Sequence, residues 1–159
     1  MAGGTHEHNL TAGNVVTQLN LALRSKPCIV YPSDMKVRAE GASDYHYPDA
    51  SVVCGEPRFE DEARDVVLNS KLVVEVLSDS TERYDRGDKF ARYQQIASLT
   101  DYLLLSSKQA RVEHFAREED GSWRLRAYGS GQRVPLPSLG VELEVDEMYR
   151  KVFEQATTP

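Results

Sequence analysis

The most continuous apolar run of the chain, "KLVVEVLS" at residues 71–78, has apolar side chains at odd and even positions alike. A strand that is apolar on both faces is typical of the middle of a sheet covered on both sides. Side chains alternate along a strand, so Val73, Glu75 and Leu77 share one face. The pattern therefore predicts that a glutamate lies within a buried, apolar face.

Shorter apolar runs predict the other elements of a sheet. Before residue 71, strands are expected at "CIVYP", "MKVRAEG" and "ASVVCG"; after it, they are expected at "DYLLLSS", "ARVEHFARE", "WRLRAYGSG" and "GVELEV". The Asp-Gly pair at 120–121 predicts a hairpin between two of them. Residues 56–70 are polar and irregular around Pro57, which predicts a loop.

Apolar positions at intervals of three and four predict three helices. The first is expected to start near Thr11 or Asn14 and to end near Arg24, after a flexible lead at residues 1–8. The second spans 79–98, with Asp79 or Ser80 as a candidate cap. The third is expected at 146–155. This order of elements predicts one mixed α/β (α+β) domain over residues 1–159, with a central mixed sheet flanked by helices.

Composition and charge narrow the class of protein. The chain of 159 residues is 40% hydrophobic and 28% charged, with a net charge of -6 that argues against a broad basic surface for nucleic acid. Its start has no secretory leader and no run reaches the roughly 20 apolar residues of a membrane helix, so we expect a cytoplasmic protein. Cys28 and Cys54 lack partners at metal-ligand spacing, which predicts buried free thiols in a reducing compartment.

Two carboxylates are candidates for chemistry. An ionised Glu75 in its apolar strand would cost several kcal/mol unless it is paired, hydrogen-bonded or metal-bound. Asp49 follows Pro48 and opens the strand 50–54, which can pair antiparallel with the strand 72–77. Two carboxylates brought together favour a hard divalent cation, Mg²⁺ or Mn²⁺. The alternatives are an ion pair between Glu75 and an arginine, and simple turn chemistry at Asp49.

Lys89 is the third candidate. On the predicted helix it borders the apolar stripe that includes Phe90, Tyr93 and Ile96. Its ammonium group could be directed over the two carboxylates to stabilise negative charge on a phosphate. The alternatives are a lysine that extends along the apolar surface to water, or a surface ion pair with Asp85 at i,i+4 spacing.

The segments "YPDASVV", "LVVEVLSDSTERYDRGDKFARY" and "DYLLL" resemble the Uma-type bacterial restriction endonuclease family, within the PD-(D/E)XK nuclease superfamily. The usual superfamily motif has a lysine two residues after the glutamate, and here that position is Leu77. In the Uma-type family the lysine lies on the following helix, at the position of Lys89. The resemblance covers about residues 5–113 and implies a restriction-endonuclease-like fold.

The resemblance also implies roles for individual residues. Asp49 and Glu75 would hold the metal together with the backbone carbonyl of Val76, and Lys89 would complete the catalytic set. Three further positions recur in the family without a defined role, and they correspond to His8, Asp85 and Tyr93.

The function implied is a magnesium- or manganese-dependent endonuclease that hydrolyses phosphodiester bonds in DNA. A homodimer is expected, because cutting both strands of a duplex needs two active sites. Two alternatives stay open at this point: a binding or regulatory module that keeps the fold without turnover, and a metal-dependent hydrolase of a small phosphate ester.

Overall fold

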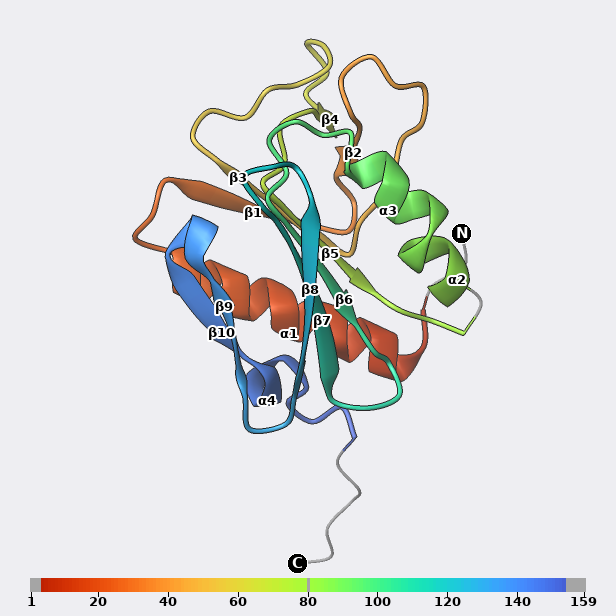
Figure 1. Ribbon diagram of the computed structural model, residues 1–159, viewed down its shortest axis with the longest axis vertical. Coiled ribbons are helices and arrows are strands. Elements are labelled where there is room, and N and C mark those ends of the chain that lie inside the picture. The colour runs from red at the N-terminus through yellow and green to blue at the C-terminus, as the bar shows by residue number, and fades with distance from the viewer. Residues whose placement is uncertain (1–3, 80, 154–159) are drawn as a thin grey trace, which may run out of the picture.

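The computed structural model describes residues 4–79 and 81–153 (Figure 1). Its centre is a six-stranded mixed sheet with strand order β1-β3-β5-β6-β7-β8, in which β5 and β6 run parallel and the other neighbours antiparallel. The strands are β1 (Cys28–Pro32), β3 (Ala50–Cys54), β5 (Leu72–Val76), β6 (Asp101–Leu105), β7 (Arg111–Arg117) and β8 (Trp123–Gly129). The predicted mixed α/β fold, with helices flanking a central sheet, is confirmed.

Helices cover the two faces of this sheet (Figure 1). α1 (His6–Leu23) packs in one core cluster, and α3 (Asp88–Tyr93), preceded by α2 (Glu82–Arg86), packs in the other. Side chains of β5 pack in both clusters. Val74 belongs to the cluster with α1, whereas Val73, together with Leu77 just after the strand, belongs to the cluster with α3. The predicted two-faced, central strand is therefore confirmed, and Glu75 lies on the α3 side.

The pairing of β3 with β5 is antiparallel, as predicted, with Ala50 opposite Val74 and Val52 opposite Leu72. The ladder stops at the Ala50–Val74 pair. This register brings the first residues of β3 to the carboxyl end of β5. Asp49 therefore lies beside the last residues of the strand that carries Glu75.

Helix α1 begins at His6, five residues earlier than the first predicted start. Thr5 is its N-cap, and the Thr5 hydroxyl accepts a hydrogen bond from the backbone N–H of His8 at 3.2 Å. The expectation of a flexible lead is therefore wrong for residues 6–8, and residues 1–3 lie outside the described residues. The consequence is that His8 has a fixed position on the first turn of a helix.

The helix predicted over 79–98 is divided at Gly87, whose backbone angles are φ -106° and ψ -92°. Glycine has a low helix propensity, so a break at this position is physically reasonable. The N-cap of α2 is Thr81 rather than Asp79, and Ser80, the other cap expected, lies outside the described residues. The division turns α3 so that its apolar side packs on β5 and β6.

Two smaller sheets complete the fold. β2 (Lys36–Val37) pairs in parallel with β4 (Val66–Val67), so the segment predicted as a loop at 56–70 contains a short strand. β9 (Arg133–Leu136), which was not predicted, pairs with β10 (Val141–Glu144) around a short 3-10 turn, Pro137–Leu139. α4 (Val145–Met148) follows and is shorter than the helix predicted at 146–155, of which 154–155 lie outside the described residues.

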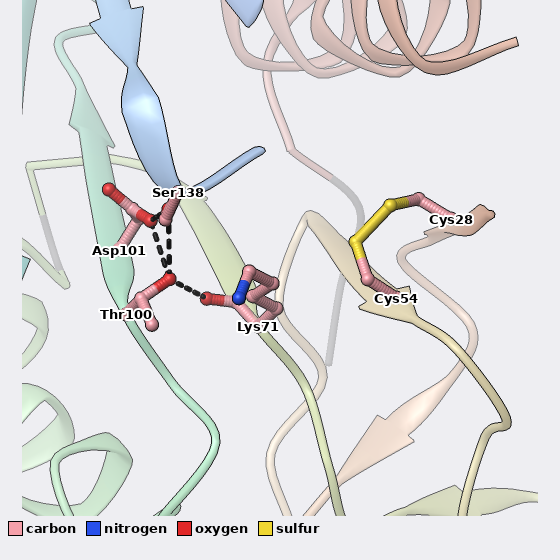
Figure 2. Close-up of a disulfide and its surroundings, with 6 residues drawn as sticks. All are labelled: Cys28, Cys54, Lys71, Thr100, Asp101 and Ser138. Atoms are coloured by element: carbon pink, nitrogen blue, oxygen red, sulfur yellow. Dashed lines mark hydrogen bonds between the residues drawn. A yellow bond between two sulfur atoms is a disulfide. The ribbon is translucent and has the colours of Figure 1, made fainter. Parts of the chain in front are cut away.

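Cys28 and Cys54 form a disulfide bond between β1 and β3 (Figure 2). The prediction of free thiols is therefore wrong. The cause is the register of the two strands, which places Cys28 directly opposite Cys54, a relation that linear spacing does not reveal. Figure 2 also shows Asp101 at the start of β6, where its carboxylate accepts hydrogen bonds from the hydroxyls of Thr100 and Ser138.

None of the helices within residues 4–79 and 81–153 has the length and apolar character needed to cross a bilayer.

Candidate active site

Asp49 lies where α1, β3 and β5 meet. Its Oδ2 accepts a hydrogen bond from the backbone N–H of Val76 at 2.7 Å, and its Oδ1 lies 3.2 Å from Nε2 of His8. Just beyond the last β3–β5 pair, the Asp49 carboxylate thus accepts the hydrogen bond from Val76 N–H that a backbone carbonyl of a longer β3 would accept. Two donors from different elements fix the orientation of the Asp49 side chain.

The contact with Asp49 changes the pKa of His8. The hydrogen bond to Asp49 is the largest influence and raises the pKa of His8, while burial lowers it and the nearby carboxylates raise it further. The imidazolium form is therefore favoured relative to a free histidine. Nδ1 of His8 is buried and has no hydrogen-bond partner among the described residues.

Glu75 is 3% exposed, on the β5 face that packs against α3. Its Oε2 lies 2.7 Å from Nζ of Lys89 and accepts a hydrogen bond from the Tyr93 hydroxyl, also at 2.7 Å. Burial has the largest effect on the pKa of Glu75 and raises it, and the negative charge of Asp49 raises it further. Lys89 and Tyr93 lower the pKa but do not offset these effects, and the pKa of Glu75 rises to about 7. The carboxyl group therefore titrates close to neutral pH.

Lys89 joins Glu75 to a second buried carboxylate. Its Nζ lies 3.5 Å from Oδ1 of Asp85, which is 2% exposed, so this i,i+4 pair is not on the surface. Burial has the largest single effect and lowers the pKa of Lys89, but Glu75 and Asp85 together outweigh it, and the net pKa is raised. Lys89 therefore carries a positive charge between two buried acidic groups.

The break at Gly87 and the apolar stripe of α3 explain how Lys89 reaches Glu75. Phe90 and Tyr93 anchor α3 on the sheet, where the Phe90 ring stacks on Tyr102 with centroids 4.8 Å apart. Lys89 and Tyr93 are one helical turn apart, so both side chains converge on the same oxygen of Glu75. Leu77, where the usual motif has its lysine, is 4% exposed in the apolar α3 cluster.

The structure thus places six predicted site residues in two neighbouring contact groups: His8 with Asp49, and Lys89 with Glu75, Asp85 and, through Glu75, Tyr93. The charge of Asp49 also acts on the pKa of Glu75. Val76 takes part through its N–H, and the C=O of a strand residue points to the same side as its N–H. The alternative of an ion pair between Glu75 and an arginine is not what the structure shows, because the cation in contact with Glu75 is Lys89. The roles assigned to these residues stay predictions.

The oxygen donors at this site are chemically suited to a hard divalent cation. Among the described residues, no cluster of three or more His, Cys, Asp or Glu side chains is arranged to hold a metal ion. The candidate ligands are instead two carboxylates and one backbone carbonyl. Lys89 and Tyr93 both contact Oε2 of Glu75. Magnesium typically uses one or two carboxylates and keeps several waters, so this donor set fits it.

Sequence reasoning missed the residues that support Asp85. The Thr81 hydroxyl donates to Oδ2 of Asp85 at 3.0 Å, and the Tyr102 hydroxyl donates to its backbone carbonyl at 3.0 Å. The Ser78 and Thr81 hydroxyls lie 2.7 Å apart. Hydroxyl residues directly after the strand, in "LSDST", were the available signal for Ser78 and Thr81. For Tyr102, the strand-start pattern "DYLLL" gives no hint of a partner on α2.

The chain is similar in sequence to one protein family and to two individual proteins. The Uma2 family model, described as "Putative restriction endonuclease", matches residues 1–146. Two Synechocystis sp. (strain ATCC 27184 / PCC 6803 / Kazusa) proteins are similar: uncharacterized protein slr1290, 36% identical over 94% of this chain and 78% of the relative, and uncharacterized protein sll1609, 34% identical over 79% and 71%.

The fold is also found among solved structures. An example is the crystal structure of a putative nuclease belonging to DUF820 from Anabaena variabilis ATCC 29413, with a TM-score of 0.74. The match covers 96% of this chain and 84% of that chain at 14% sequence identity, so the likeness is one of fold.

Proposed function

The chain belongs to the Uma2 family, described as "Putative restriction endonuclease", and from this membership we propose that it is a metal-dependent endonuclease that hydrolyses phosphodiester bonds in DNA. The observation that carries the proposal is the 2.7 Å contact between Lys89 on α3 and Glu75 on β5. It supports the idea that a lysine from the next helix supplies the charge that Leu77 cannot supply.

Each residue of the site has a distinct part in the proposed reaction. Asp49, Glu75 and the carbonyl of Val76 would hold Mg²⁺ or Mn²⁺. When bound, such an ion polarises a phosphate and lowers the pKa of a water molecule. Lys89 would donate to a phosphate oxygen and offset the negative charge that develops during hydrolysis.

The surrounding residues position these groups. Tyr93 donates a hydrogen bond to Oε2 of Glu75 and so fixes the orientation of its carboxylate. His8 on α1 contacts Oδ1 of Asp49, and the N–H of Val76 on β5 donates to its Oδ2, so both oxygens of Asp49 have a partner. Asp85 shares the ammonium group of Lys89, so that Lys89 is not bound to Glu75 alone.

Two further features of the proposal concern assembly and location. Cleavage of both strands of a duplex would require two such centres, which a homodimer would supply, and sedimentation velocity would measure the oligomeric state. A DNA substrate favours the cytoplasm, where the Cys28–Cys54 bond would be exposed to reduction.

Plasmid and single-stranded circular DNA, incubated with Mg²⁺, Mn²⁺ or EDTA, provide the test. Glu75→Gln and Lys89→Met should each lower the cleavage rate by about 10²–10³-fold, in the range found when one charge-stabilising group is removed. The matched controls are Glu142→Gln and Lys108→Met, whose side chains are 51% and 69% exposed in surface ion pairs. They should change the rate less than about twofold, as surface substitutions usually do.

Cleavage that persists in EDTA, or that survives both site substitutions, would show that the proposed centre is not the active one. A wild-type protein that binds DNA without cutting it under any of these conditions would instead support a non-catalytic module with this fold.

A further inference from the structure

Two of the exposed tyrosines are neighbours in sequence of candidate site residues. Of eight tyrosines, three are exposed: Tyr45 at 46%, Tyr47 at 53% and Tyr84 at 43%. The hydroxyl of Tyr45 donates to Glu60, away from the site residues, whereas Tyr47 lies two residues before Asp49 and Tyr84 directly before Asp85. The rings of Tyr47 and Tyr84 are the ones that could take part in binding at the site.

Tyr47 stands next to the metal-binding carboxylate. It is two residues before Asp49, and Pro48 holds it in an extended conformation. Two extended residues span at most about 7 Å, so the Tyr47 backbone lies close to the Asp49 carboxylate. The exposed ring of Tyr47 is therefore attached to the chain within this reach of Asp49.

Tyr84 stands next to the proposed catalytic lysine. It directly precedes Asp85 on α2, and the Nζ atom of Lys89 lies 6.0 Å from the centroid of the Tyr84 ring. The two rings are thus attached beside different site residues, Tyr47 beside Asp49 and Tyr84 beside Lys89. A phosphate bound between Asp49 and Lys89 would have an exposed tyrosine near each of its two neighbouring nucleotides.

Most cationic side chains near the site are already paired with carboxylates, which limits the positive charge available to bind the phosphates of a duplex. Affinity for double-stranded DNA comes largely from lysines and arginines that neutralise phosphates. Here most of the neighbouring cations already contact carboxylates: Lys89 with Glu75 and Asp85, Arg86 with Glu82 and Glu113, Arg92 with Asp44, and Arg38 with Glu60. Arg83 on α2 forms no ion pair among the described residues. Together with a net charge of -6 over the chain, these pairs favour a source of binding energy besides phosphate neutralisation.

A recess beside the site adds room for a base. It has a volume of about 320 Å³ and is lined in part by His46, Arg92 and Tyr93. Tyr93 connects the recess to the site, because its hydroxyl binds Glu75 and its ring contacts the His46 ring with centroids 5.1 Å apart. The segment from His46 to Asp49 runs from this recess to the proposed metal site.

We infer that the DNA strand is unpaired where it is cut, and that its bases stack on Tyr47 and Tyr84 at either side of the scissile phosphate. The inference rests on the proposed nuclease function and specifies its substrate as single-stranded DNA. Bases inside a duplex are already stacked and are not free to lie on a protein ring. Stacking on aromatic side chains is the usual source of affinity for a single strand, and it does not require a sequence preference.

Fluorescence anisotropy with a labelled 15-nucleotide thymidine strand, and with the same strand paired to its complement, tests this substrate class. The measurements are made in EDTA, so that no cleavage occurs. Wild type should bind the single strand at least about tenfold more tightly than the duplex. Tyr47→Leu and Tyr84→Leu should each weaken single-strand binding about 5- to 140-fold, which corresponds to the range for one stacked base.

Tyr47→Phe and Tyr84→Phe are the matched controls, because they keep the ring and lose only the hydroxyl. They should bind within about twofold of wild type, as should Leu125→Ala, an exposed apolar substitution on β8. Equal or tighter binding of the duplex, no binding of either DNA, or unchanged binding by both leucine variants would each overturn the inference. The nuclease proposal fails separately, if cleavage survives Glu75→Gln.

Discussion

Replacing Lys89 by methionine should give the protein a stability that falls steeply as pH rises. Methionine keeps most of the apolar length of the side chain but removes the charge 2.7 Å from Oε2 of Glu75. Glu75 is 3% exposed, so without Lys89 its ionised form would be a buried charge with no cation in contact. The pKa of Glu75 in the folded variant should therefore rise above its wild-type value of about 7.

The sign and size of the effect follow from this pKa. A carboxyl group whose pKa is higher in the folded state stabilises the fold below its unfolded pKa, and that stability is lost as pH rises through the folded pKa. For wild-type Glu75, the interval from 4.5 to about 7 corresponds to about 3 kcal/mol. Each further unit in the variant costs about 1.4 kcal/mol at high pH. Removing one partner of a buried ion pair costs about 3–5 kcal/mol when the other stays charged.

Urea denaturation followed by circular dichroism at pH 5, 7 and 9 measures this dependence. At pH 5, where Glu75 is protonated in both proteins, we expect a loss of about 1 kcal/mol, typical of a single substitution. At pH 9 the loss should reach about 3–5 kcal/mol. The double variant with Glu75→Gln removes one of the two buried carboxylates that Lys89 contacts, so it should recover the part of the loss at pH 9 that is due to Glu75, while Asp85 stays without its cation. A cost that is equal at pH 5 and pH 9 would refute this account of the Glu75–Lys89 pair.

Three other predictions concern the same site and its support. Mn²⁺ affinity should rise with pH through about 7, because Glu75 must lose its proton to bind the ion; an affinity that is flat between pH 6 and pH 8 would contradict this. Tyr93→Phe should lower the free energy of unfolding at pH 8 by about 1–3 kcal/mol, measured by urea denaturation, because a buried carboxylate loses a hydrogen bond. The variant Cys28→Ser/Cys54→Ser should lose about 3.5 kcal/mol of stability, expected for a loop with a sequence separation of 26, yet keep its Mn²⁺ affinity. Unchanged stability or weakened Mn²⁺ binding in that variant would show that the bond has another role.

The centre of the sheet was predictable because its signals are local. The unbroken apolar pattern of β5 identifies a strand with two covered faces, and alternation assigns Glu75 to the face of Val73. Antiparallel pairing with β3 was predicted because the two apolar strands are consecutive and are joined by the polar residues 55–71. The closeness of Asp49 and Glu75 was expected from the antiparallel pairing of their strands, and the apolar stripe beside Lys89 directed its side chain toward them. The role of Lys89 as the displaced lysine of the motif was expected only through the family resemblance.

The errors have physical causes of two kinds. Helix α1 was started too late because its first turn is polar, and the hydroxyl of Thr5, not an apolar pattern, defines its beginning. β9 was missed because Pro135 interrupts a short run, although edge strands tolerate proline. The Cys28–Cys54 bond depends on the register between strands that are far apart in sequence, and spacing alone does not give it.

The most direct test of the central claim is a calorimetric titration of Mn²⁺ into wild type, Glu75→Gln and Lys89→Met at pH 8. The account assigns the ion to the carboxylates and the substrate phosphate to the lysine. Wild type and Lys89→Met should therefore both bind one Mn²⁺ per chain, with weaker binding in Lys89→Met at pH 8 because the pKa of its Glu75 is raised, and with Lys89→Met inactive in DNA cleavage. Glu75→Gln should give no binding heat. Binding in Glu75→Gln that equals wild type, or a loss of binding in Lys89→Met that raising the pH to 9 does not reverse, would contradict the account.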